Sequence, residues 1–150
     1  IEYNARFGDP ESLNVLSILE SDFVEICQMM IQGNLSRDKA RFANAATVCK
    51  YAVPIGYPDA PLKNEIIDIS AVKNTEQLYL SAVDLWDGKL IATGSRTAAI
   101  VGIGETISDA EKIAEADIQR ITGQLFHRED IGTDALLQKR VQHMVELRST

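Results

Sequence analysis

The chain has 150 residues, 45% hydrophobic and 25% charged, which is typical of a soluble globular protein with one domain or a small domain plus an attached piece. The formal net charge of −7 argues against a nucleic-acid partner, which requires clustered Lys and Arg. No apolar run approaches the roughly 18 residues of a membrane span, so we expect no membrane partner either.

Residues 1–7 are predicted to form a β-strand with two different faces. Because strand side chains alternate, Glu2, Asn4 and Arg6 share one face while the opposite face is apolar. Glu2 and Asn4 offer oxygen ligands to a hard cation such as Mg²⁺, and Arg6 lies beside them to hold an anionic substrate. The alternative is an ordinary strand whose polar face is solvated. Asn is a poor strand former, which favours the functional interpretation.

Two helices are predicted next. Asp9 is expected to cap a helix over residues 10–19, and Asp22 to cap a second helix. The apolar stripe of the second helix consists of Phe23, Ile26, Cys27, Met30 and Ile31. Gly33 ends this helix, and residues 36–44 are expected to be a linker or a single helical turn.

Strand signals replace helical ones after residue 45, which places a domain boundary between residues 1–45 and residues 46–150. Strands are predicted at residues 46–53, 65–69, 77–85, 90–93 and 97–103. The Asp87-Gly88 pair between two of these runs is a strong hairpin signal.

Two helices are predicted to close the chain. Ser108 and Glu111 form a capping box at the start of the first. Its inward stripe consists of Ala110, Ile113, Ala114, Asp117, Ile118 and Ile121. Thr133 is expected to cap the second. That last helix is predicted to turn four apolar side chains inward: Leu137, Val141, Met144 and Val145. Strands followed by helices predict an α+β fold, a small antiparallel sheet or barrel with packed helices.

Three further groups of residues are candidates for function. Arg96 follows a glycine between two predicted strands, where freed backbone N–H groups and the guanidinium suit an anion; the alternative is a bend with a solvated arginine. Residues 126–132 are dense in ionisable groups, which fits acid–base chemistry or a charged connector between helices. Cys27 and Cys49 lack metal-ligand spacing and are expected to be reduced thiols, which favours the cytoplasm.

Residues 2–11, Glu-Tyr-Asn-Ala-Arg-Phe-Gly-Asp-Pro-Glu, resemble the last metal-binding strand of the ATP-grasp domain in the glycinamide ribonucleotide synthetase (phosphoribosylamine–glycine ligase) family. Motifs in the order expected for the C-terminal domain of that family extend the resemblance over residues 1–140. They are Gly56-Tyr57-Pro58, Asp87-Gly88-Lys89, Gly94-Ser95-Arg96, Gly104-Glu105-Thr106 and Arg128-Glu129-Asp130-Ile131-Gly132. Ile55 and Ser95 depart from the family pattern, which has a glycine at each position.

The resemblance implies that residues 1–45 end an ATP-grasp domain and that residues 46–150 form a β-barrel-like C-terminal domain with two helices. It implies a ligase of purine biosynthesis that uses ATP, glycine and 5-phosphoribosylamine and forms a glycyl phosphate. In the family, the Glu and Asn of the E-x-N-x-R pattern bind Mg²⁺ or Mn²⁺. These roles carry over to Glu2 and Asn4, while Arg6 would face the acyl phosphate. Arg96 would contribute binding of the phosphoribosyl end of the substrate.

Two alternatives stay open. Carboxylase-type ATP-grasp ligases share E-x-N-x-R, although the Phe-Gly-Asp-Pro-Glu continuation over residues 7–11 favours the synthetase. The chain also lacks a glycine-rich phosphate loop, so by itself it is expected to be an inactive packing or interaction module that needs the remainder of the ATP-grasp domain. We expect the chain to be a fragment in which residues 1–44 pair with another chain or a second copy, while residues 46–148 fold independently.

Overall fold

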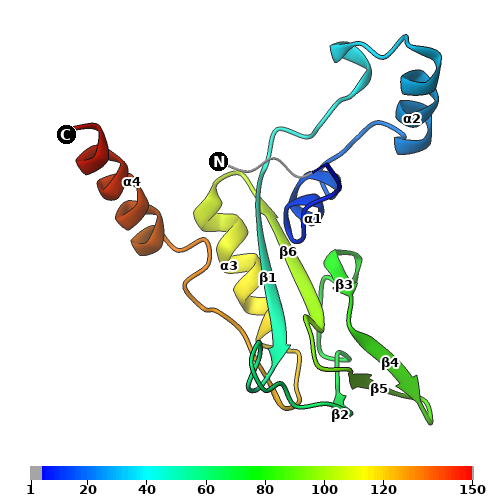
Figure 1. Ribbon diagram of the computed structural model, residues 1–150, viewed down its shortest axis with the longest axis vertical. Coiled ribbons are helices and arrows are strands. Elements are labelled where there is room, and N and C mark those ends of the chain that lie inside the picture. The colour runs from blue at the N-terminus through cyan, green and yellow to red at the C-terminus, as the bar shows by residue number, and fades with distance from the viewer. Residues whose placement is uncertain (1–4, 150) are drawn as a thin grey trace.

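The computed structural model describes residues 5–149 and contains two small antiparallel sheets with helices around them (Figure 1). In the larger sheet, β1 (Ala46–Pro54) pairs with β6 (Ala98–Gly104) along most of its length. β3 (Leu78–Leu80) lies beyond β6, and β7 (Leu125–Phe126) lies beyond β1. The strand order is β3-β6-β1-β7, and the predicted α+β class is confirmed.

A second sheet has the order β2 (Glu65–Ile67), β5 (Lys89–Ala92) and β4 (Val83–Trp86). The hairpin predicted from Asp87-Gly88 is confirmed, with Trp86 opposite Lys89. Asp87 and Gly88 have φ angles of 48° and 72°, and positive angles at both positions are what a type I′ turn requires.

The single strand predicted over residues 77–85 is wrong. After the short 3₁₀-helix η2 (Thr75–Gln77), the chain contributes β3 to one sheet and β4 to the other. Between these strands, the N–H groups of Ser81 and Ala82 donate to the carbonyls of Thr97 and Arg96 at 2.9 and 2.8 Å. These bonds hold the chain where it passes between sheets, and alternating hydrophobicity does not encode such a point.

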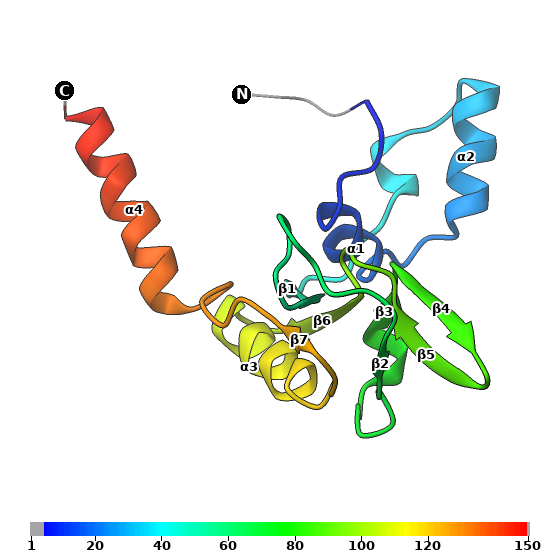
Figure 2. The same ribbon diagram turned by 60° about the horizontal axis from the view of Figure 1, so that its bottom comes forward.

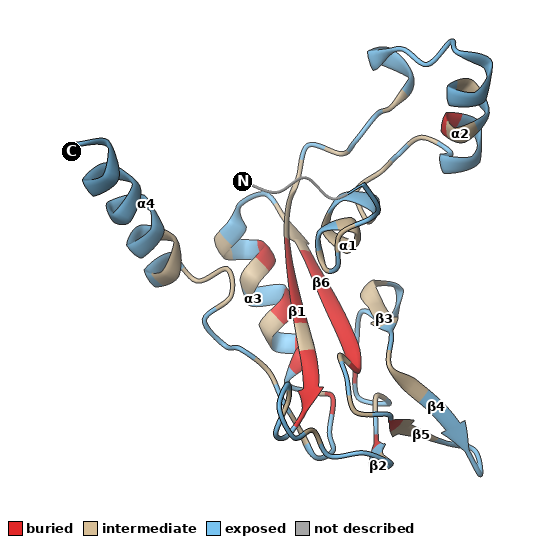
Figure 3. Ribbon diagram, viewed as in Figure 1, coloured by how far each residue is buried: buried red, intermediate tan, exposed pale blue. Residues whose placement is uncertain are grey.

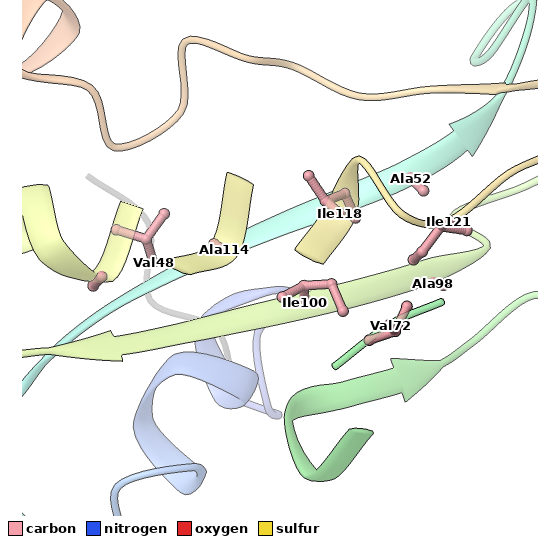
Figure 4. Packing of buried hydrophobic residues seen from close by; sticks show 9 residues of the cluster. Val48, Ala52, Val72, Ala98, Ile100, Ala114, Ile118 and Ile121 are labelled. Carbon is pink, nitrogen blue, oxygen red and sulfur yellow. The ribbon is translucent and has the colours of Figure 1, made fainter. Parts of the chain in front are cut away.

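α3 (Ile107–Ile118) covers one face of the larger sheet, and the main core lies between them (Figure 4). The buried members of this core are Val48, Ala52, Val72, Ala98, Ile100, Ala110, Ala114, Ile118 and Ile121. Gly102 of β6 permits the close approach of the helix, because a Cβ there would collide with the backbone of Ala110. The predicted inward stripe is confirmed, apart from the more exposed Ile113.

The capping box predicted at Ser108 and Glu111 is wrong by two residues. Thr106 is the N-cap of α3, and its Oγ1 accepts a hydrogen bond from the N–H of Asp109 at 3.2 Å. The hydroxyl of Thr106 also donates to the Asp109 carboxylate at 2.6 Å. Both pairs have the spacing of a capping box, but the helix begins two residues earlier than predicted, soon after β6 ends at Gly104.

The N-terminal part contacts the larger sheet through its first helix and through Asp9, the residue that precedes Pro10 at the start of that helix. α1 (Glu11–Leu16) lies on the face opposite α3, where Leu13 packs on a cluster of Cys49, Ala99 and Val101 (Figure 2). α2 (Phe23–Gln32) and the turn η1 (Arg37–Lys39) extend away from the sheets (Figure 1). The predicted cap at Asp22 is confirmed by bonds from the N–H groups of Val24 and Glu25, and Gly33 ends the helix.

The last helix, α4 (Asp134–Arg148), begins at the predicted cap Thr133, whose Oγ1 accepts from the N–H of Leu136. The prediction that it turns apolar side chains inward is wrong, because Val141, Met144 and Val145 are all exposed. The helix projects away from both sheets, so these residues reach no core within residues 5–149 (Figure 3). Across residues 5–149, no helix is both long and apolar enough to cross a membrane.

Candidate functional site

Two predicted site residues, Glu2 and Asn4, lie outside the residues that the structure describes. Arg6 is described and exposed, and its Nη1 donates to the carbonyl of Phe7 at 2.9 Å. Residues 5–7 form a bend and coil, so the strand predicted over residues 1–7 is wrong for these three positions. A strand needs a hydrogen-bonded neighbour, and no strand within residues 5–149 pairs with them.

Arg96 lies in an ion pair with Asp9. The predicted capping role of Asp9 is wrong, because α1 begins at Glu11 with Pro10 in the cap position and no side chain caps it. Asp9 Oδ2 instead accepts from Nη1 of Arg96 at 3.0 Å, and Oδ1 accepts from the Tyr51 hydroxyl at 2.7 Å. The Arg96 guanidinium carbon lies 5.6 Å from the centroid of the Tyr51 ring, within cation–π range.

Burial and the Asp9 carboxylate together set the charge states of Tyr51, Arg96 and Cys49. Burial, reinforced by the hydrogen bond to Asp9, raises the pKa of Tyr51, so its hydroxyl remains a donor. Burial alone would lower the pKa of Arg96, but the hydrogen bond and charge of Asp9 outweigh it and raise that pKa. Burial and the charge of Asp9 also raise the pKa of the Cys49 thiol to about 12, so Cys49 is a neutral thiol here rather than a nucleophile.

Arg96 lines a hollow of about 500 Å³ beside β1. Cys49, Tyr51 and Val53 face it because alternate residues of a strand point the same way. The remaining walls come from the start of α1, the turn after β1 and the segment around β7: Pro10, Tyr57, Pro58, Phe126, Arg128 and Ile131. An apolar hollow bordered by Arg96 suits a small anionic molecule, whereas the guanidinium of Arg128 is paired with Asp130. The sequence does not identify Tyr51 or Tyr57 as site residues, because only the tertiary fold brings them to the hollow that Arg96 lines.

The opposite face of β1 carries a buried lysine. The side chain of Lys50 is fully buried, and its Nζ donates to Glu111 at 2.7 Å and also to Glu115. A third bond runs from Nζ to the carbonyl oxygen of Glu129 at 2.9 Å. Because a buried ammonium needs such partners, this cluster ties the segment that contains Glu129 to α3. That segment also carries Arg128 onto the wall of the hollow.

In the charged segment of residues 126–132, the side chains of His127, Arg128 and Asp130 are all paired. Arg128 donates through Nε and Nη2 to the two carboxylate oxygens of Asp130 at 3.0 and 2.7 Å. The hydrogen bonds from Arg128 lower the pKa of Asp130. His127 Nε2 lies 3.0 Å from Glu115 Oε1. These pairs favour the connector interpretation over acid–base chemistry.

No metal centre is formed by the part of the chain that the structure describes, where no three His, Cys, Asp or Glu side chains lie close enough to hold an ion. The expected ligands Glu2 and Asn4 precede that part. Their carboxylate and amide oxygens are the donors that a hard cation prefers. Cys27 and Cys49 are free thiols, as predicted.

Residues 47–134, more than half of the chain, match the protein family described as "Phosphoribosylglycinamide synthetase, C domain". Curated relatives named phosphoribosylamine–glycine ligase match nearly the whole chain. The protein from Methanosarcina barkeri is 48% identical over 148 residues. The proteins from Methanocorpusculum labreanum and Methanocaldococcus jannaschii are 50% identical over 149 residues and 48% identical over 151. Each match covers 99% of this chain and 34% of the relative.

A crystal structure of phosphoribosylamine–glycine ligase from Thermotoga maritima has the same fold, with a TM-score of 0.71 and 27% sequence identity. The superposition covers 87% of this chain and 32% of the Thermotoga chain. The chain thus spans about a third of the length of the relatives that it matches.

Proposed function

The chain belongs to the phosphoribosylglycinamide synthetase C-domain family, and we propose that it is the C-terminal part of an ATP-dependent ligase of purine biosynthesis. This ligase joins glycine to 5-phosphoribosylamine through a glycyl phosphate, the reaction that the resemblance of residues 2–11 implies. The relatives' printed names and the share of their length that this chain covers support the assignment. The remainder of the ATP-grasp domain supplies the nucleotide-binding elements, so this chain alone is inactive. The enzyme is cytoplasmic.

The position of Arg96 on the wall of the apolar hollow is the main support for a substrate-binding role of this chain. Phosphoribosylamine ends in a phosphate, and an arginine fork matches phosphate geometry through two parallel hydrogen bonds. Arg96 binds this phosphate end, and the apolar wall around it removes competing water. Its task is to position the substrate, which is the protein's main contribution to reactions of this class.

The metal site lies on the segment that precedes the described residues. Glu2 and Asn4 hold Mg²⁺ or Mn²⁺ there, and the bound ion neutralises charge on phosphate oxygens. Arg6 orients the acyl phosphate, and its exposure in the structure leaves its guanidinium accessible to a ligand. The support for these roles is the residue pattern and the donor chemistry.

Two arginine variants of the full-length ligase test these assignments. Arg96→Ala removes a phosphate-binding group, so it raises KM for phosphoribosylamine about tenfold and leaves kcat within about twofold. Arg6→Lys replaces a fork with a point charge, so it lowers kcat instead. Arg37→Ala, in the exposed turn η1, is the control and leaves both constants unchanged. An unchanged KM in Arg96→Ala would return Arg96 to an ordinary surface residue. Absence of ligase activity in the unmodified enzyme would overturn the function itself.

A further inference from the structure

We propose that Asp9 is a positioning residue that couples the segment carrying Arg6 to Arg96, so that both arginines are presented to the same substrate. The proposal rests on the function proposed above. Asp9 belongs to the N-terminal segment, whereas Arg96 lies between β5 and β6, 87 positions further along the chain. Their contact joins the two predicted domains directly at the hollow.

Asp9 holds Arg96 through more than one atom. Its Oδ2 accepts from Nη1 of Arg96 at 3.0 Å, and its own carbonyl oxygen accepts from the same nitrogen at 3.3 Å. Its Oδ1 accepts from the Tyr51 hydroxyl, while the Tyr51 ring lies under the guanidinium. Arg96 is therefore fixed between a carboxylate and a ring, and the carboxylate is fixed by the residue that carries the ring. A long arginine side chain held in this way loses little further freedom when a ligand binds.

The orientation of Arg96 leaves its ligand-binding edge available. Within residues 5–149, the hydrogen bonds of Arg96 use Nη1 alone, and all of them go to Asp9. The Nε–H and Nη2–H groups form the second edge of the guanidinium, with the spacing that a phosphate or carboxylate matches. Asp9 thus occupies one edge of the arginine without consuming the other.

The covalent distance from Asp9 to the proposed catalytic segment is short. Asp9 follows Arg6 by three residues, which span at most about 11 Å even when fully extended. Glu2 and Asn4 lie on the same segment. A displacement of Arg96 relative to this segment therefore strains the Asp9 contacts. Asp9 is thus the residue that holds Arg96 at a fixed position relative to Arg6.

Asp9 and Arg96 are both partly exposed, with side-chain exposures of 47% and 41%, so their substitution leaves the core intact. Asp9→Asn keeps the shape but removes the charge, and Asp9→Glu keeps the charge. Tyr51→Phe keeps the ring and removes only the bond to Oδ1. Asp38→Asn is the matched control, because it removes an exposed ion pair, to Lys39, that lies away from the hollow.

The test measures KM for phosphoribosylamine in the full-length ligase, together with the inhibition constant of ribose 5-phosphate as a non-reacting probe. We expect Asp9→Asn to raise both about fivefold with kcat within about twofold, and Asp9→Glu to restore part of the loss. Tyr51→Phe gives a smaller increase in the same direction. The decisive measurement is the double variant: in an Arg96→Ala background, Asp9→Asn adds less than about twofold, because its effect acts through Arg96.

Three outcomes would overturn the proposal. An equal increase for Asp9→Asn with and without Arg96 would mean that Asp9 acts independently of the arginine. If Arg96→Ala raised these constants and Asp9→Asn did not, Asp9 would have no positioning role, while the binding role of Arg96 would stand. No effect of Arg96→Ala on either constant would remove the phosphate-binding role itself, and with it the role of Asp9.

Discussion

The N-terminal and C-terminal regions of this chain place their apolar side chains in opposite ways. In the larger sheet, Ile100 and Val101 are 0% exposed, and α3 covers the core from one side. In residues 5–45, Ile31 is 87% exposed and Met30 is 53% exposed, although both lie on the apolar stripe of α2. An amphipathic helix is stabilised by burial of its stripe. The C-terminal region contains its own core, whereas we infer that the N-terminal region is one edge of a larger core.

If only the C-terminal region contains its own core, substitutions in the N-terminal segment lower the activity of the full-length enzyme rather than the stability of the fold. The largest effect is expected from the metal ligands. In the full-length enzyme, Glu2→Gln or Asn4→Ala lowers kcat about 100-fold and raises the required metal concentration, since a lost ligand weakens transition-state charge stabilisation by several kcal/mol. The melting temperature remains unchanged. Near-normal rates of both variants at low Mg²⁺ would mean that this segment is only a scaffold.

A pair of identical substitutions compares the stability of the two regions. Ile100→Ala in the isolated chain leaves a cavity in the core and lowers the free energy of unfolding by about 2–5 kcal/mol. Ile31→Ala removes the same atoms from an exposed position and changes that free energy by no more than about 0.5 kcal/mol. Urea unfolding of both variants measures the difference. Equal losses of unfolding free energy would show that α2 is as well packed as the sheet, which would contradict the difference in packing between the two regions.

Whether the sequence predicted a feature depends on how far apart along the chain the interacting residues lie. The capping box predicted at Ser108 was two residues away from the N-cap Thr106. Three other signals that act over a few residues were confirmed: the Asp87-Gly88 hairpin, the Asp22 cap and the Gly33 helix end. Each depends on backbone angles or on a hydrogen bond to a near neighbour, so a short window contains the whole cause. The resemblance of residues 2–11 to a ligase family was confirmed at the family level by the comparisons.

Features that depend on distant residues were not predictable. Asp9 fits a helix cap by sequence, but its carboxylate binds Tyr51 and Arg96, residues that only the tertiary fold brings close. The inward face expected for α4 fails for the same reason, because periodicity shows that a stripe exists and not what covers it. Local rules that give way at a candidate site, as at Asp9, are where functional demands are expected to override them.

The smallest expected effect concerns stability at acid pH, which depends on a buried carboxylate of the C-terminal region. Asp117 is buried and accepts from the N–H groups of Lys73 and Asn74 at 3.2 and 3.1 Å. Burial would raise the pKa of Asp117, but these bonds, with those from Asn74 and Arg120 side chains, outweigh it and lower that pKa. The unfolded chain then binds more protons, so this contribution to stability is complete above about pH 4 and is lost on further acidification.

Unfolding of the isolated chain between pH 5 and pH 3 measures this contribution. The unmodified chain loses more stability over that interval than Asp117→Asn, because the variant has no carboxylate to protonate. Asp59→Asn, at an exposed position in the turn after β1, is the control. Equal acid sensitivity of the chain and the Asp117→Asn variant would assign the effect to other carboxylates.

Limited proteolysis of the isolated chain at low concentration tests the division into two regions most directly. The segment between Asn34 and Asn44 connects α2 to β1 and is largely exposed, so it is expected to be cut first. We expect early cleavage there and a stable fragment that starts near residue 46 and contains both sheets and α3. Uniform resistance along the chain in a dilute monomer would contradict it, because the N-terminal region would then have its packing partner within this chain.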